Sequence, residues 1–205
     1  MAPQDPRVQR TKHKLHQAFT ALIAETHYRQ ITVHDLVQRA EISRATFYLH
    51  YADKDALLTE IGGRLIEVFE AQFQAWHMMR DAFSRESVDA LFQIVADNQR
   101  LCSIVLVNMD GSIAGAQLEN RLVHGLETRL YELLTADEAY EPALSVNLLC
   151  GYTAHAFAGL LRWWLQNDMP YSTEAMAQIS RQLQLFGIMP FVSGATVPAF
   201  GSSML

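Results

Sequence analysis

The chain has 205 residues, of which 50% are hydrophobic, 10% aromatic and 19% charged, the composition of a globular protein with a substantial core. No stretch reaches the roughly 18 uncharged apolar residues of a membrane span, because the longest apolar segment, Ala154–Leu165, contains His155 and Arg162. The amino end lacks the apolar stretch of a secretory signal, so the sequence predicts a cytoplasmic protein without membrane contact.

The formal charge of −6 is unevenly distributed along the chain. Residues 1–64 carry nine Lys and Arg against seven Asp and Glu, a balance of +2, whereas residues 65–205 carry seven against fifteen, a balance of −8. All three lysines (Lys12, Lys14 and Lys54) lie in the first part. A mildly basic part joined to an acidic one favours a protein that contacts phosphates at one end only.

The first predicted helix carries one apolar stripe at positions i, i+3, i+4, i+7 and i+8, which comprises Leu15, Ala18, Phe19, Leu22 and Ile23. Two short helices follow it. Thr32 is the predicted N-cap of the second helix and Ser43 that of the third, with a tight turn at Glu41 between them. Phe47 and Tyr51 form the inward side of the third helix. Two short helices joined by such a turn and braced by a longer one are typical of a helix-turn-helix.

A fourth, long helix opens at Asp53 or its neighbour and is followed by further predicted helices at Val88–Asn98, Leu101–Met109, Ala116–Leu134, Pro142–Leu165 and Thr173–Phe186. No strand alternation occurs, so the predicted fold is all-α. We expect an N-terminal tail (1–8), a three-helix DNA-binding domain (9–54, motif about 32–51), a helical ligand-binding and dimerisation domain (55–190) and a flexible C-terminal tail (191–205).

The outward face of the third helix has the character of a surface that enters the major groove of DNA. At about 100° per residue, Ala45, Thr46 and Leu49 lie opposite the inward side, with Arg44 and Tyr48 flanking them. Small residues permit close approach, arginine can bind guanine bidentately, and apolar groups can meet thymine methyls. The five are predicted base contacts. The predicted phosphate contacts are Thr32, His34, His50 and Lys54.

Residues 31–58, ITVHDLVQRAEISRATFYLHYADKDALL, resemble the signature of the TetR family of bacterial transcriptional regulators. That signature runs T-V-x-x-[IL]-x-x-x-A-x-[IV]-S-x-x-T-[FLI]-Y-x-[HY]-[FY]-x-x-K-x-x-L-L. The chain departs from it at Glu41 and at His27, where glycine is usual. The resemblance implies a homodimer of nine- or ten-helix subunits that binds near-palindromic operator DNA, usually a repressor released by a small molecule. It places the same residues at the bases and phosphates.

The family resemblance also places an effector pocket and a dimer interface in the C-terminal domain. The predicted pocket residues are Phe69, Phe73, Trp76, Met79, Phe83, Phe92, Met109 and Tyr131. The predicted dimer residues, on the last two helices, are Leu148, Gly151, His155, Ala158, Gly159, Trp163, Ile179, Leu183 and Phe186. Methionines and aromatic residues at helical spacing are more often plain core than pocket lining, whereas the stripes of the last two helices favour a dimer over burial within one subunit. Because few cations remain after Lys54, we expect an apolar or cationic effector.

Enzymatic chemistry finds no support in the sequence. His77, His124 and His155 are isolated, and no HExxH, P-loop or G-x-S-x-G pattern occurs. Cys102 and Cys150 are two distant thiols without a CxxC motif, which indicates buried apolar residues rather than a metal site. We therefore predict no enzyme activity, no metal and no cofactor. Two alternatives stay open: a structural or cell-cycle DNA-binding factor without an effector, and an enzyme with an appended DNA-binding domain.

Overall fold

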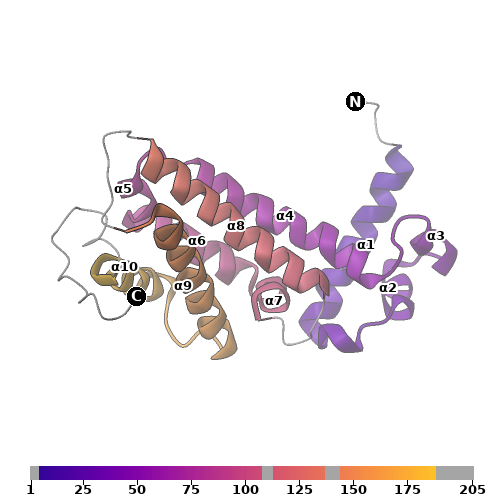
Figure 1. Cartoon of the computed structure of the whole chain (residues 1–205). Coiled ribbons are helices and arrows are strands. Elements are labelled where there is room, and N and C mark those ends of the chain that lie inside the picture. Colours follow the sequence, from indigo (N-terminus) through magenta and orange to yellow (C-terminus); the bar gives the residue numbers. More distant parts are fainter. Residues whose placement is uncertain (1–4, 108–112, 137–143, 188–205) are drawn as a thin grey trace, which may run out of the picture. The chain divides into compact units, whose positions relative to one another are not determined.

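The computed structural model describes residues 5–107, 113–136 and 144–187, and every regular element in these ranges is helical (Figure 1). This confirms the all-α fold. The elements are α1 (Pro6–Glu25), η1 (Tyr28–Gln30), α2 (Val33–Ala40), α3 (Arg44–Tyr48), α4 (Lys54–Gln74), α5 (Met79–Ala82), α6 (Arg85–Asp97), α7 (Gln99–Cys102), the π-helical turn η2 (Ser103–Val107), α8 (Ile113–Thr135), α9 (Val146–Gln166) and α10 (Thr173–Gly187).

Local side-chain hydrogen bonds fix where the early helices begin. The side-chain oxygens of Thr32, Ser43 and Asp53 each accept a hydrogen bond from the backbone N–H three residues later, at 3.3, 3.0 and 2.8 Å. Each bond satisfies one of the amide groups that the first turn of a helix leaves without a partner. The predicted starts of α2, α3 and α4 are confirmed.

The chain divides into two compact units, residues 1–67 with 98–121 and residues 68–97 with 122–205, so that α4 and α8 each run through both. In the first unit α1 packs on α2, and α2 on α3. Fully buried side chains at this junction include Leu15, Phe19, Leu36 and Phe47. The borders between these units fall inside α4 and α8, whereas the sequence predicted a domain boundary between residues 54 and 55.

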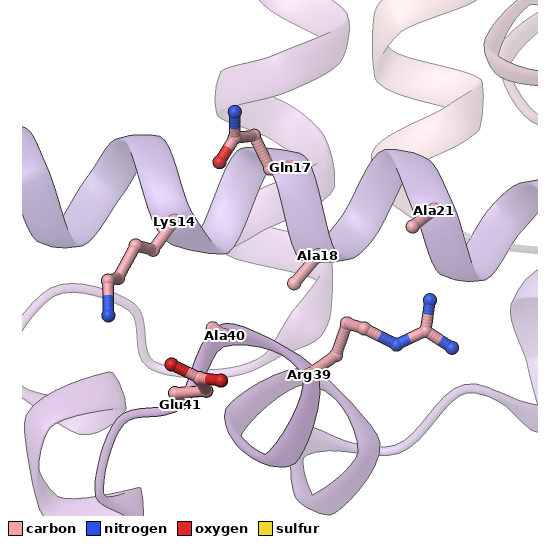
Figure 2. Close-up of a pocket in the computed structure, with 7 residues that line it drawn as sticks. All are labelled: Lys14, Gln17, Ala18, Ala21, Arg39, Ala40 and Glu41. Carbon is pink, nitrogen blue, oxygen red and sulfur yellow. The ribbon is translucent and has the colours of Figure 1, made fainter.

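Small residues let α1 and α2 approach closely in the first unit. Ala18 and Ala40 are buried at the crossing, and an open groove of about 330 Å³ lies beside them (Figure 2). The rim of the groove is charged: Arg39 donates to both carboxylate oxygens of Glu25, at 2.9 and 2.6 Å. The open, charged character of the groove does not suit an apolar ligand.

The turn between α2 and α3 is held by an unusual residue. Glu41 has φ 52° and ψ 49°, the left-handed conformation in which glycine is usual. Its backbone N–H donates to Gln38 O, and the N–H of Ile42 donates to Val37 O at 3.1 Å. Glutamate therefore adopts the turn geometry that the family signature normally gives to glycine.

In the second unit α10 packs along α6, and Phe92 of α6 forms edge-to-face contacts with Phe157 and Trp164 of α9, with ring centroids 5.7 and 5.4 Å apart. The carboxyl end of α4 is held by Arg129, whose guanidinium donates to the carbonyls of Phe73 (3.1 Å) and Trp76. A cation at this position suits the negative end of the helix dipole.

Several boundaries differ from the sequence expectations. Helix α1 begins at Pro6, so residues 6–8 of the predicted tail are helical. The predicted helix Leu101–Met109 is instead the short α7 followed by the π-helical turn η2, and α5 was not expected. Helix α9 begins at Val146, while Pro142 and the predicted tail 191–205 lie outside the described residues.

No single helix among the described residues has the length and apolar character needed to cross a membrane. One bent pair, α6 with Gln99–Val107, meets the criteria of length and composition alone.

The glycine pair in α4 provides a matched test of packing. A Cβ at Gly62 would lie 2.4 Å from Cδ1 of the buried Leu118, whereas a Cβ at Gly63 would meet only Arg121 Nη1 at an ordinary 3.6 Å. Both alanine variants gain the same helix propensity. We expect Gly62→Ala to be less stable than Gly63→Ala by about 1–3 kcal/mol, the usual cost of overpacking, in parallel urea titrations.

Two roles are open to this pair of glycines within a helix: a hinge for signalling, or close helix packing. Equal stabilisation by both alanines would mean that Leu118 yields freely and that the glycines serve motion instead.

Candidate functional site

Helix α3 presents its predicted outward face to solvent. The side chain of Leu49, which caps the helix, is 82% exposed; Tyr48, Arg44 and Ala45 are exposed too, while Phe47 is fully buried. A single exposed leucine is common on protein surfaces, and it gains apolar contact only if another surface covers it.

Two of the predicted base contacts are already oriented by neighbours. The guanidinium of Arg44 donates to the hydroxyl of Tyr48 at 3.3 Å and lies over its ring, 5.7 Å from the centroid. The hydroxyls of Thr46 and Ser43 share a hydrogen bond of 2.8 Å. These contacts already restrict the side chains in the free protein, so that less conformational entropy is lost on binding.

The predicted phosphate contacts at the start of α2 and the end of α3 are accessible. Thr32 and His34 are exposed and His50 is half-buried. Thr32 forms a capping box with Asp35, whose carboxylate accepts from the Thr32 hydroxyl and backbone N–H at 2.7 and 2.8 Å. These hydrogen bonds hold the pKa of Asp35 below its usual value.

Lys54 has protein partners for its ammonium group. Its Nζ donates to the carbonyls of Ile31 (2.8 Å), Tyr28 (2.9 Å) and Arg29 (3.3 Å), and lies 4.5 Å from the centroid of the Tyr28 ring. Tyr28 also donates from its hydroxyl to Asp55 on the same turn of α4. The first turn of α4 is therefore hydrogen-bonded to the η1 segment that leads into α2.

A cluster of charged and aromatic side chains joins α1 to α4 beside the end of the motif. Lys12 Nζ lies 2.6 Å from Glu60 Oε2, and His16 Nε2 lies 3.2 Å from both Glu60 Oε1 and the Tyr51 hydroxyl. Arg64 Nη1 lies 3.3 Å from His16 Nδ1. We call these five residues the α1–α4 cluster.

The α1–α4 cluster favours neutral His16. Burial lowers the pKa of His16, and the positive charge of Arg64 lowers it further against the opposing effect of Glu60. Neutral His16 can accept from Arg64 through Nδ1 while Nε2 donates to Glu60 or Tyr51. Burial by itself raises the pKa of Glu60, but the hydrogen bond and charge of Lys12 outweigh it and leave that pKa lowered.

A pH test follows from the lowered pKa of His16. Below its unfolded pKa of about 6.5 the unfolded chain binds the proton more readily than the folded one, so the free energy of unfolding should fall as the pH drops from 7.5 to 5.5. Urea titrations of His16→Gln should show a shallower fall over this range than the wild type. The exposed His13 supplies the control, since His13→Gln should keep the wild-type fall. A His16→Gln variant with the wild-type fall would rule out this role.

A small cavity of about 20 Å³ lies in the second unit. Trp76 and Phe83, both predicted pocket residues, line it. The remaining lining is apolar except for Thr153 and Gln184. By volume it has room for about one water molecule.

The other predicted pocket residues lie elsewhere. Phe69, Phe73 and Phe92 are fully buried core residues that do not line the cavity. The rings of Phe69 and Phe73 contact each other on α4, and that of Phe92 contacts α9. Tyr131 is exposed and lines a separate open groove between α8 and α9. The side chain of Met79 and the whole of Met109 lie outside the described residues.

The predicted dimer residues divide into exposed and buried members. Leu148 of α9 (59% exposed), Leu183 of α10 (61% exposed), Trp163 and His155 face solvent in the single chain. Ala158 is buried within its own unit. Gly151, Gly159 and Ile179 are partly buried, and the side chain of Phe186 lies outside the described residues.

Two protein-family models match the chain. Residues 17–61 match the model of "Bacterial regulatory proteins, tetR family", and residues 84–185 match that of a "Transcriptional regulator C-terminal region" of the same family. The chain belongs to the TetR family of transcriptional regulators. Members of this family are DNA-binding regulators and not enzymes, as the sequence predicted.

Individual relatives agree with this assignment. An uncharacterized HTH-type transcriptional regulator of Bacillus subtilis, YxbF, is 47% identical over 55 residues, which are 26% of this chain and 14% of that protein. FadR of Bacillus subtilis in complex with stearoyl-CoA is similar in structure (TM-score 0.67, 20% identity, 86% of this chain and 98% of FadR). NalD, a repressor of a multidrug efflux pump in Pseudomonas aeruginosa, is similar too (TM-score 0.70, 16% identity, 89% and 98%).

Two groups of residues were not predicted from the sequence. The α1–α4 cluster joins residues almost 50 positions apart, such as Lys12 and Glu60, for which no local pattern exists. Gln184 and Thr153 of the cavity come from amphipathic helices whose polar residues normally face solvent. For the cluster, the only signal was the basic start of the first helix.

Proposed function

We propose that this TetR-family protein is a homodimeric repressor that binds operator DNA in the cytoplasm and is released by a small-molecule effector. The observation that carries the proposal is the face of α3, where Leu49 is 82% exposed beside Arg44 and Ala45. Such a face offers thymine methyls an apolar contact and guanine a bidentate donor. It bears no acidic side chain that phosphates would repel.

Phosphate contacts would flank this face. Thr32 and His34 lie at the first turn of α2, where backbone amides point outwards, and His50 follows α3. We assign these three to phosphates, together with the charge balance of +2 in residues 1–64. We do not assign Lys54 to a phosphate, because its ammonium group already donates to backbone carbonyls.

The exposed apolar face of α9 and α10 supports dimerisation. Leu148, Trp163 and Leu183 would become buried in a helix bundle formed with a second copy. A Cβ added to Gly159 would meet nothing within 4 Å, so its own unit does not require glycine there. Close approach of a partner helix explains the small residue. An isologous dimer predicts near-palindromic operators.

The effector class differs from that in the FadR complex. Stearoyl-CoA carries phosphates that need cations, yet residues 65–205 contain no lysine. Arg129 and Arg181 donate to the carbonyls of Phe73 and Phe83, at 3.1 and 3.0 Å. We therefore propose an apolar or cationic effector that binds at the small cavity of the second unit.

A second candidate is a DNA-binding factor that works without an effector. The small volume of the cavity, about 20 Å³, favours it. Thermal unfolding in the presence of a compound library separates the two, because a sensor must gain stability with at least one compound class.

The proposal is tested by selecting duplexes from a random pool with the full chain and footprinting the enriched sequence. We expect enrichment of a near-palindrome with two protected half-sites. No enrichment, or protection of one asymmetric half-site at concentrations where the protein is dimeric, would refute it.

A further inference from the structure

The small cavity of the second unit carries a few polar groups. Its wall is contributed by Trp76, which follows α4, by the α5 region and by helices α6, α8, α9 and α10. Trp76, Thr153 on α9 and Gln184 on α10 bring polar atoms to an otherwise apolar lining. No charged side chain lines this cavity among the described residues.

Two residues that line the cavity carry buried polar atoms without hydrogen bonds. Among the described residues, the buried side-chain atoms without a protein partner are Trp76 Nε1 and Gln184 Oε1, whose residues line the cavity, and Ser180 Oγ and Asp89 Oδ1, whose residues do not. Trp76 is 3% exposed and Ser180, one turn before Gln184 on α10, is 1% exposed. An unsatisfied buried donor or acceptor costs about 1–3 kcal/mol, so most proteins avoid them.

Neighbouring polar groups in the same unit are satisfied. Trp164 Nε1 donates to Tyr171 O at 3.0 Å, and Thr153 Oγ1 donates to Leu149 O at 2.7 Å. Among the residues that line the cavity, Thr153 is therefore satisfied, whereas Trp76 and Gln184 leave one donor and one acceptor without a protein partner. This is the arrangement of a ligand site, in which apolar walls supply affinity and a few polar groups fix orientation.

We propose that the effector is a neutral, mainly apolar molecule with one acceptor for the indole N–H of Trp76 and one donor for the amide oxygen of Gln184. Alcohols, phenols and amides are the matching classes. This inference rests on the proposed function and narrows it, since a charged group would be buried here without a counter-ion. Because the cavity has room for only about one water, the effector must bind a wider state and so shift the equilibrium towards it.

The test uses four probes of one size on the full chain: benzyl alcohol, toluene, benzoate and benzylammonium. Binding is followed through the indole N–H signals of a ¹⁵N-labelled sample, in which Trp76→Phe identifies the signal of Trp76. We expect benzyl alcohol to move that signal and to bind about two- to tenfold more tightly than toluene, the worth of one hydrogen bond. The two ions should bind more weakly than benzyl alcohol.

Matched variants isolate the two polar atoms. In Gln184→Leu and in Trp76→Phe the advantage of benzyl alcohol over toluene should shrink, because each variant removes one of its two hydrogen-bond partners, whereas in Trp163→Phe, at an exposed tryptophan, it should persist. Without any probe, Trp164→Phe should lower the urea midpoint further than Trp76→Phe, because only Trp164 loses a hydrogen bond.

The inference is overturned if no probe moves the Trp76 signal, if benzoate or benzylammonium binds best, or if both cavity variants keep the wild-type preference. DNA selection is measured separately on the same protein. If DNA is enriched but the probe series fails, only the proposed effector class is refuted. If the probes bind selectively but no DNA is enriched, the proposed regulatory function is refuted.

Discussion

Replacing Arg44 by alanine is expected to weaken binding to the selected operator by about 1–3 kcal/mol and to relax the preference at one base pair of each half-site. The guanidinium is exposed and rests against Tyr48, 3.3 Å from its hydroxyl, so its removal leaves no buried partner unsatisfied. The fold should therefore persist. Titrations against the operator and against duplexes with single base-pair changes measure both effects.

Arg39 provides the matched control for Arg44. It is also an exposed arginine of the motif, but it pairs with Glu25 beside the groove of Figure 2. Arg39→Ala should leave the base preference unchanged. If Arg44→Ala retains both affinity and preference, α3 does not read bases in the way proposed.

Replacing Lys54 by methionine is expected to lower the free energy of unfolding by about 1.5–3 kcal/mol, the range for a hydrogen bond that involves a charged group. Methionine keeps most of the apolar stem but removes the donors to the carbonyls of Tyr28 and Ile31. The segment that leads into α2 then loosens, and DNA affinity should fall for all sequences alike. Urea titrations and binding titrations measure the two losses.

The salt dependence of binding separates this positioning role from the phosphate contact that the sequence predicted. If Lys54 only positions α2, Lys54→Met lowers affinity at every salt concentration and leaves the slope of log K against log salt unchanged. A direct phosphate contact instead reduces the slope by about 0.9 for each subunit. Lys14→Met, at a lysine of the open groove, should leave the stability nearly unchanged.

Features that depend on neighbouring residues were accessible from the sequence. The caps at Thr32 and Ser43 act within one turn, and the buried stripe of α1 follows from helical periodicity alone. The exposed face of α3 follows from the same periodicity, since Phe47 must point inwards. These elements needed no knowledge of distant contacts.

Features that depend on distant partners were not accessible. The carbonyls bound by Lys54 lie 23 to 26 positions earlier in the chain, and a lysine near a DNA-binding motif looks like a phosphate contact until they are seen. The aromatic residues Phe69, Phe73 and Phe92 have the composition of a pocket, yet packing makes them core. Which apolar side chains surround a cavity is decided by how helices cross, which residue types alone do not specify.

The salt dependence of wild-type binding to the enriched duplex tests the central claim most directly. Two subunits whose basic side chains in residues 1–64 each neutralise a few phosphates predict a steeply negative slope of log K against log salt, about −0.9 for each phosphate neutralised. Binding that weakens with this steepness, with one dimer on each near-palindromic duplex, is the expected result. A slope near zero would contradict the claim that the surface around α3 holds operator DNA.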